Sequence, residues 1–187
     1  MTEYLTETLK WGADYLIASH KSDNEFIAQI GDPGVEKDIW ESPENLFVAR
    51  PSFRVDSNNP GTEVVAETAA ALAASSIWFA SVGEADLSLD CITHARTLFN
   101  FANSSRGEFK KQKPLKINNL MGLNQKSISN SLLFHLIGRY TKSIPSAAGY
   151  YSSWNGYNDE LVWAASWIAK VLFIIKLYPI SKSTCQS

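Results

Sequence analysis

The run of small residues at positions 66–76, AETAAALAASS, most constrains what this chain can fold into. Alanine has the highest helix propensity, and small side chains let a helix approach its neighbours closely on more than one side. The turn sequence NNPG at residues 58–61 precedes it, so the helix should begin directly afterwards. Thr62 is a candidate N-cap, and Glu63 and Glu67 place acidic groups where the helix dipole favours them. These features predict a buried central helix.

Helical periodicity continues on both sides of this run. Apolar residues recur at helical spacing over residues 4–19 and 87–103, and a third amphipathic stretch follows residue 158. Residues 21–62 predict a long loop, in which only residues 25–30 alternate as a strand does. The pattern therefore predicts an all-α chain. Its last helix is expected to turn inward the apolar residues Leu161, Val162, Trp163, Ala165 and Trp167.

Composition predicts one domain and narrows the range of partners. The chain has 187 residues, of which 45% are hydrophobic, which is enough for one sizeable core. A net charge of -2 gives no positive electrostatic potential to attract a polyanion, so we expect no nucleic-acid partner. The N-terminus lacks a secretory signal pattern, and Lys170, Lys176 and Pro179 interrupt the apolar residues 161–180, so no membrane partner is expected either.

Four stretches of the chain resemble the family-9 glycoside hydrolases. Residues 50–79, RPSFRVDSNNPGTEVVAETAAALAASSIWF, resemble the family pattern RPxxxxDxxxPGSDxAGETAAAxAAxSIVF. Residues 150–161, YYSSWNGYNDEL, resemble the family pattern YYxSWSGYxDEL. The sequences at residues 9–20 and 90–107, in predicted helices, resemble family patterns as well. The resemblance implies an endo-β-1,4-glucanase, a cellulase that hydrolyses internal bonds of cellulose or cellooligosaccharides with inversion. It also implies an extracellular location.

The resemblance further implies the architecture, a partial (α/α)6 barrel of the six-hairpin glycosidase type. A complete barrel has six inner helices ringed by six outer ones, and loops at one end form an open groove. The chain corresponds to a middle section with about four of these helices. We therefore expect residues 1–187 to be a single incomplete catalytic domain.

The same resemblance implies four substrate-binding residues. Trp40, Trp154 and Tyr157 are candidates to stack on sugar rings, whose C–H faces are apolar while their hydroxyl groups need polar partners. Asp159 is a candidate to fix the cleft wall, and Asn158 or Asp159 is equally suited to cap the last helix. Trp40 has an alternative role in holding its loop to the core. At Lys37 the family has a histidine, so a neutral ring near the sugar is missing.

No catalytic residue is assigned. Inverting hydrolysis needs one carboxyl group as acid and a second as base on a water molecule. The family carries its base in an Asp-x-Gly-Asp motif and its acid on a distant Glu, and neither region is found among these 187 residues. The chain alone is therefore expected to be inactive and poorly folded, with its alanine-rich helix lacking partners. A non-catalytic carbohydrate-binding remnant and a helical scaffold are the alternative functions.

Residues 108–138 and 171–187 depart from the family pattern. The first segment reads as a non-family insertion, and two origins compete: a surface insertion, which loops tolerate at low entropic cost, and translated intron, which the close match on both sides favours. The tail at residues 171–187 either extends the last helix or is non-native sequence.

No cofactor is expected from the residues themselves. Some relatives hold a structural calcium ion, for which Glu84, Asp86 and Asp159 are conceivable ligands, but no EF-hand spacing supports such a site, so no metal ligand is assigned. Asp14 and His20 are expected on a helix surface, and His94 is expected to pack within the helices.

Overall fold

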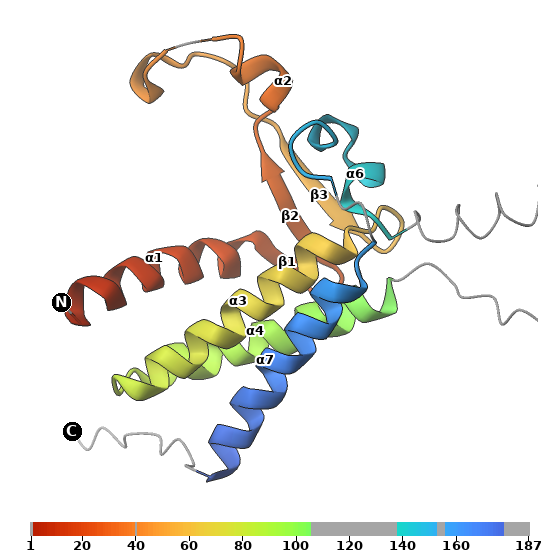
Figure 1. The fold of residues 1–187 in the computed structure, drawn as a ribbon. Coiled ribbons are helices and arrows are strands. Elements are labelled where there is room, and N and C mark those ends of the chain that lie inside the picture. Colours follow the sequence, from red (N-terminus) through yellow and green to blue (C-terminus); the bar gives the residue numbers. More distant parts are fainter. Residues whose placement is uncertain (1, 40, 106–137, 153–155, 178–187) are drawn as a thin grey trace, which may run out of the picture.

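The structure, a computed structural model, describes residues 2–39, 41–105, 138–152 and 156–177. This part of the chain is mostly helical, with one small sheet at the end where α3 begins (Figure 1). Its four long helices confirm the expected ones, and they are α1 (Thr2–Ser19), α3 (Thr62–Ser81), α4 (Ala85–Ser104) and α7 (Asn158–Leu177). A short helix, α6 (Tyr140–Ser143), and a 3-10 turn, η2 (Pro145–Ala147), precede α7.

Helix α3 is the centre of the fold, as the run of small residues predicts. It forms an antiparallel hairpin with α4 through a turn in which Gly83 adopts a φ of 88°, a conformation that favours glycine. Helix α7 lies along α3 as well (Figure 1). The N-cap of α3 is Gly61, and Thr62 is already the first helical residue, so the prediction of Thr62 as the cap was wrong.

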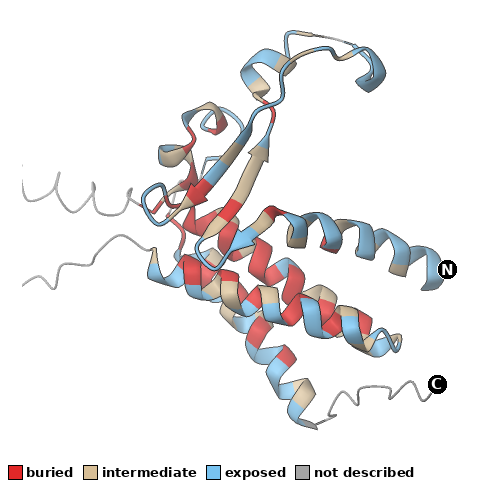
Figure 2. Cartoon of the chain, turned by 180° about the vertical axis from the view of Figure 1, so that it is seen from behind, coloured by how far each residue is buried: buried red, intermediate tan, exposed pale blue. Residues whose placement is uncertain are grey.

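The alanine-rich helix does not lack partners, contrary to expectation. Figure 2 shows the buried residues concentrated on α3 and on the sides of α4 and α7 that face it. Small side chains permit this close approach on two sides. The large exposed apolar side chains of the described residues lie outside α3, for example Trp11 on α1 and Phe173 on α7.

The buried face of α7 differs from the predicted one. Leu161, Ala164, Ile168 and Val171 form its buried stripe, whereas Val162 is 66% exposed and Trp163 is 55% exposed. A helix buries residues three and four positions apart when its neighbours lie on one side, and adjacent residues then point away. Helix α7 runs on to Leu177 with Val171 buried, so the first part of the divergent tail extends the last helix. Residues 178–187 lie outside the described residues.

A small three-stranded antiparallel sheet accompanies the helices of this mostly helical chain. Its strands are β1 (His20–Ser22), β2 (Glu25–Ile30) and β3 (Ser52–Asp56), in the order β1-β2-β3. Strand β2 is the extended segment that the sequence predicts. Phe26 and Val55 are register partners on β2 and β3, and both side chains are buried in the core. Burial of these two side chains fixes the sheet against the helices.

The predicted loop contains two further short elements, α2 (Pro33–Glu36) and η1 (Pro43–Asn45). Asp32 caps α2, since its side chain accepts a hydrogen bond of 2.8 Å from the Gly34 N–H. Gly31 adopts a φ of 86°, which explains the glycine before this cap.

Among the described residues, α3 alone has the length and hydropathy of a membrane-spanning helix, with a mean hydropathy of 1.4. Half of this stretch is buried in the core, where α3 packs mainly against α4 and α7.

Candidate functional site

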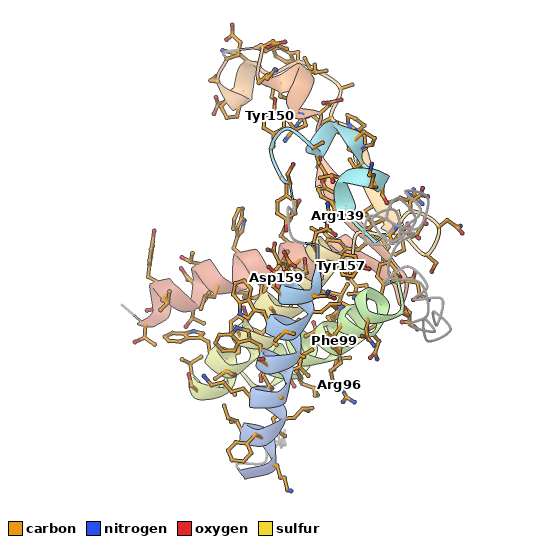
Figure 3. All side chains as sticks on the ribbon, turned by 45° about the vertical axis from the view of Figure 1, so that its right-hand side comes forward. Arg96, Phe99, Arg139, Tyr150, Tyr157 and Asp159 are labelled. Atoms are coloured by element: carbon orange, nitrogen blue, oxygen red, sulfur yellow. The ribbon has the colours of Figure 1, made fainter. Side chains whose placement is uncertain are left out.

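The beginnings of α3 and α7 meet the segment that follows residue 137 at one end of the helices. Arg139, Tyr157 and Asp159 lie near the start of α7 (Figure 3). A Cβ atom added at Gly138 would lie 2.8 Å from Tyr157 Cε1 and 2.9 Å from Thr62 Oγ1. Only glycine fits between these two residues, so the three segments are in direct contact.

Glu63 is the most enclosed charged residue of this site. It is 0% exposed, and its Oε1 accepts a hydrogen bond of 2.7 Å from the Tyr140 N–H. Its Oε2 is buried and has no hydrogen-bond partner among the described residues. Burial raises the pKa of Glu63 to about 7, although backbone N–H groups and the nearby Arg139 favour the ionised form. Glu63 is therefore able to hold a proton near neutral pH.

The side chain of Tyr140 extends this contact to the sheet. Its hydroxyl group donates a hydrogen bond of 2.7 Å to Gln29 Oε1 on β2. Gln29 Nε2 in turn donates to the carbonyl oxygen of Gly31 at 2.8 Å. Burial, with a smaller effect from Glu63, raises the pKa of the Tyr140 hydroxyl to about 12, so it remains a donor. Tyr140 thus completes a polar path from the start of α3, which its backbone N–H contacts, to the loop that follows β2, which its hydroxyl group reaches through Gln29.

A second group of polar residues lies at the start of α7. Burial, followed by a hydrogen bond with Asp159, raises the pKa of Glu160 to about 7. The same hydrogen bond lowers the pKa of Asp159, which is consistent with a protonated Glu160 donating to an ionised Asp159. Burial and a hydrogen bond with Glu67 raise the pKa of Tyr151. The Tyr151 ring meets Tyr140 edge-on at a centroid distance of 5.7 Å, so the two groups of polar residues adjoin.

This arrangement positions chain segments and does not itself form a catalytic pair. An inverting glycosidase presents its acid and its base to the substrate from opposite sides. Glu63 is enclosed on all sides, and Asp159 and Glu160 are adjacent and share a hydrogen bond. The buried carboxyl group of Glu63 instead fastens the start of α3 to Tyr140, in the segment that follows residue 137.

Comparison with known proteins identifies the fold. The profile of glycosyl hydrolase family 9 matches residues 1–126. The chain belongs to glycosyl hydrolase family 9. It is 36% identical to an endoglucanase of Dictyostelium discoideum over 91% of this chain and 20% of that protein. It is 38% identical to endoglucanase 10 of Arabidopsis thaliana over 87% of this chain and 25% of that protein. The chain thus spans a fifth to a quarter of these relatives.

Solved structures of the family confirm the partial helical barrel. An endoglucanase of the termite Nasutitermes takasagoensis is 34% identical and matches 94% of this chain with a TM-score of 0.70, over 33% of its own chain. The endoglucanase CelQ of Clostridium thermocellum, crystallised with cellobiose and cellotriose, is 26% identical. It matches 98% of this chain with a TM-score of 0.59, over 24% of its own chain.

Two of the four predicted family-9 substrate residues are described, and they differ in exposure. Tyr157 is 6% exposed, with its ring against Gly138, whereas Asp159 is exposed on the first turn of α7. Trp40 and Trp154 lie outside the described residues. Binding of sugar by these four residues stays a prediction.

The conceivable calcium ligands do not come together. Asp159 is at the start of α7, beside the start of α3, whereas Glu84 and Asp86 follow the end of α3. A helix of 20 residues is about 30 Å long, so one ion cannot bind all three. No group of three or more His, Cys, Asp or Glu residues in the described part of the chain is placed to hold a metal ion.

A histidine pair is the main feature that sequence reasoning missed. His20 is not on a helix surface as predicted but begins β1, where its Nδ1 lies 2.8 Å from Nδ1 of His94 on α4. Asp14, in contrast, does lie on the surface of α1, where it pairs with Lys10 at 2.6 Å. The two histidines are 74 positions apart, so no local spacing signals their contact.

Proposed function

We propose that this chain is part of an endo-β-1,4-glucanase domain that hydrolyses internal 1,4-β-glucosidic bonds of cellulose with inversion. The main support is the match to the termite endoglucanase, at 34% identity and a TM-score of 0.70 over 94% of this chain. Because the chain spans a third of that structure, the activity belongs to a longer protein that contains these residues.

The proposed substrate is a β-1,4-glucan. CelQ, 26% identical to this chain, was crystallised with cellobiose and cellotriose, which are short β-1,4-glucans. In our proposal the loop after β2 and the start of α7 form one wall of the substrate cleft. Trp40, Trp154 and Tyr157 supply apolar surface there, and Asp159 supplies a polar group. Cellulose is an extracellular polymer, so the proposal places the complete protein outside the cell.

The polar path from Glu63 to Gln29 supports the proposal that this chain forms a wall of the cleft, while other residues supply the catalytic pair. It joins the start of α3, the segment after residue 137 and the loop after β2 through hydrogen bonds of 2.7–2.8 Å. A cleft wall made of loops needs such fixed contacts, since small displacements of binding groups weaken catalysis considerably. The acid and base themselves are assigned to residues outside this chain.

The test compares the chain alone with the chain joined to the coding sequence that flanks it in the genome. Release of reducing ends and loss of viscosity are measured on carboxymethylcellulose, with a β-1,3-glucan as the control substrate. We expect activity only for the extended protein and only on the β-1,4-linked polymer. Turnover by the chain alone would refute the assignment of both catalytic groups to residues outside it.

The stereochemistry of the product is a separate test. Nuclear magnetic resonance of the first products from cellotetraose should show the α-anomer, because inversion converts a β-linkage into an α-hydroxyl group. Initial release of the β-anomer would refute the inverting mechanism. A complete protein that cleaves no β-1,4-glucan would refute the proposed function itself.

A further inference from the structure

We propose that His20 and His94 form a proton-sensitive clamp that fastens the junction of α1 and β1 to α4. The clamp is closed while at most one of the two imidazole rings carries a positive charge, and it opens when both rings are charged. This inference does not depend on the proposed glucanase activity.

The geometry of the pair requires a single shared proton. The two Nδ1 atoms are 2.8 Å apart, and the rings meet at an interplanar angle of 79° with a centroid distance of 4.9 Å. An N···N separation of this size is a hydrogen bond, in which one nitrogen donates N–H and the other accepts with its lone pair. If both Nδ1 atoms carried a proton, two N–H groups would face one another and the contact would be lost.

The surroundings of the pair favour one direction for this hydrogen bond. His94 Nε2 lies 3.7 Å from Asp90 Oδ1, so a proton on His94 Nε2 faces a carboxylate. His94 then accepts at Nδ1, and His20 donates from its own Nδ1–H. In this arrangement the remaining nitrogen of His20, Nε2, carries a lone pair. That atom is buried and has no hydrogen-bond partner among the described residues.

Neither ring accepts a further proton without a cost. A proton on His20 Nε2 would create a buried charge without a partner. A proton on His94 Nδ1 would reverse the hydrogen bond and move the proton of neutral His20 to its buried Nε2, where the N–H would have no acceptor among the described residues. Burial, followed by the charge of His94, lowers the pKa of His20 below its ordinary value of 6.5. The closed clamp disfavours the charged form of the rings. Folding therefore releases protons from this histidine pair near and below neutral pH.

The charged groups around the pair do not reverse this preference. Asp23, in the turn after β1, acts in the opposite direction on His20 but has a smaller effect than burial and His94. Asp90 lies on the α4 side, next to His94. Glu25, which begins β2, is paired with Arg54 at 3.0 Å. Acid therefore weakens the contact.

The N-terminal helix depends on few such contacts, so loss of the clamp should loosen it. Helix α1 is largely exposed (Figure 2), and Ala13 is its buried apolar residue. Thr6 accepts a hydrogen bond of 3.1 Å from Trp78 Nε1 near the first turns of α1. His20 fastens the opposite end. Opening at low pH should thus free the α1–β1 junction while the α3–α4 hairpin stays folded.

Hydrogen exchange on the 187-residue chain tests the clamp directly. Protection at residues 14–22 should fall about tenfold for each pH unit between about pH 6.5 and pH 5, after correction for the intrinsic exchange rate. Protection of α3 and α4 should change much less. His94→Gln replaces the ring with an amide that does not titrate, so this pH dependence should become clearly shallower, leaving the part that burial of His20 alone contributes. His135→Gln, which changes the third histidine of the chain, is the control and should retain the full dependence.

A second measurement keeps the proposal testable if the His94 variant does not fold. In the ¹⁵N-labelled wild-type chain, a through-hydrogen-bond coupling should join the two Nδ1 atoms at about pH 8 and vanish at about pH 5. Persistence of this coupling at pH 5, or uniform loss of protection in all helices, would overturn the proposal. Equal pH dependence in wild type and His94→Gln would overturn it as well.

Discussion

The carbonyl oxygens of Ser105 and Gly138 both accept hydrogen bonds from Thr62. The Thr62 N–H donates to Gly138 at 2.8 Å, and the Thr62 hydroxyl group donates to Ser105 at 3.4 Å. These two residues border the segment 106–137, so both ends of that segment lie at the first residue of α3. Each extended residue spans about 3.3–3.6 Å, and a linker of about four residues is long enough to connect the ends.

We therefore predict that residues 106–137 can be replaced by a Gly-Ser linker of about four residues without loss of the fold. Shortening 32 residues to about four is three halvings of loop length, which should raise the free energy of unfolding by up to about 2 kcal/mol. Urea unfolding followed by circular dichroism measures this. A Gly-Ser linker of the original length is the control and should show no gain.

A non-cooperative unfolding transition in the shortened chain would contradict this prediction. Retention of the fold agrees with both origins predicted for residues 108–138, a surface insertion or translated intron. Comparison of the transcript with the genomic sequence separates these two origins, because only an insertion remains in the spliced message.

Gly138→Ala should destabilise the fold. The added Cβ would meet Tyr157 at 2.8 Å and Thr62 at 2.9 Å, and such overpacking costs about 1–3 kcal/mol. Gly149→Ala is the matched control because a Cβ at that position has no atom within 4 Å. Urea midpoints of the two variants give the comparison, and equal midpoints would show that the junction at Thr62 is not tightly packed.

Glu63→Gln should reduce the pH dependence of stability. The folded pKa of Glu63, about 7, lies above the ordinary value of 4.5, so the folded state binds more protons than the unfolded state. This stabilisation is present below about pH 4.5 and is lost as the pH rises to 7, by about 3 kcal/mol in all. Glutamine still accepts from the Tyr140 N–H and stays neutral, so the variant should gain stability over wild type at pH 8.

The matched control for Glu63→Gln is Glu7→Gln, at an exposed position of α1. Urea unfolding at pH 5 and pH 8 should show the changed slope for the Glu63 variant alone. Equal slopes for wild type and Glu63→Gln would mean that Glu63 is ionised throughout this range.

Cellotetraose should quench the tryptophan fluorescence of the chain if its aromatic residues retain a sugar-binding surface. Removal of one stacked ring costs about 0.5–1.5 kcal/mol, so Trp154→Ala and Trp40→Ala should each weaken binding by about twofold to tenfold. Trp11→Ala removes an exposed ring from α1 and is the control. Quenching that Trp11→Ala abolishes, or no quenching at all, would favour the scaffold alternative.

The long helices are predictable because their signals are local. The alanine-rich run predicts α3, and the helical spacing of apolar residues predicts α1 and α4. The buried side of α7 is not predictable in this way, since Val162 and Ala164 are both apolar and only the placement of neighbouring helices decides which is covered. Strand β3 is too short to show a clear alternating pattern, and it is stabilised by its pairing with β2.

The polar contacts of the site are beyond sequence reasoning for a related reason. The sequence shows Glu63 as a favourable charge on a first helical turn, but its burial depends on Tyr140, 77 positions away. The contact of His20 with His94 likewise depends on how β1 meets α4. Such contacts follow from tertiary packing and leave no periodic pattern.

The packing of α3 against both α4 and α7 also bears on the order in which the protein is made. On the ribosome, α3 and α4 emerge one after the other and can pair at once, because contacts between neighbours in sequence form quickly. Helix α7 emerges later, so one flank of the nascent hairpin is open to solvent during translation. Chaperone binding to that flank is expected to cease once α7 has docked.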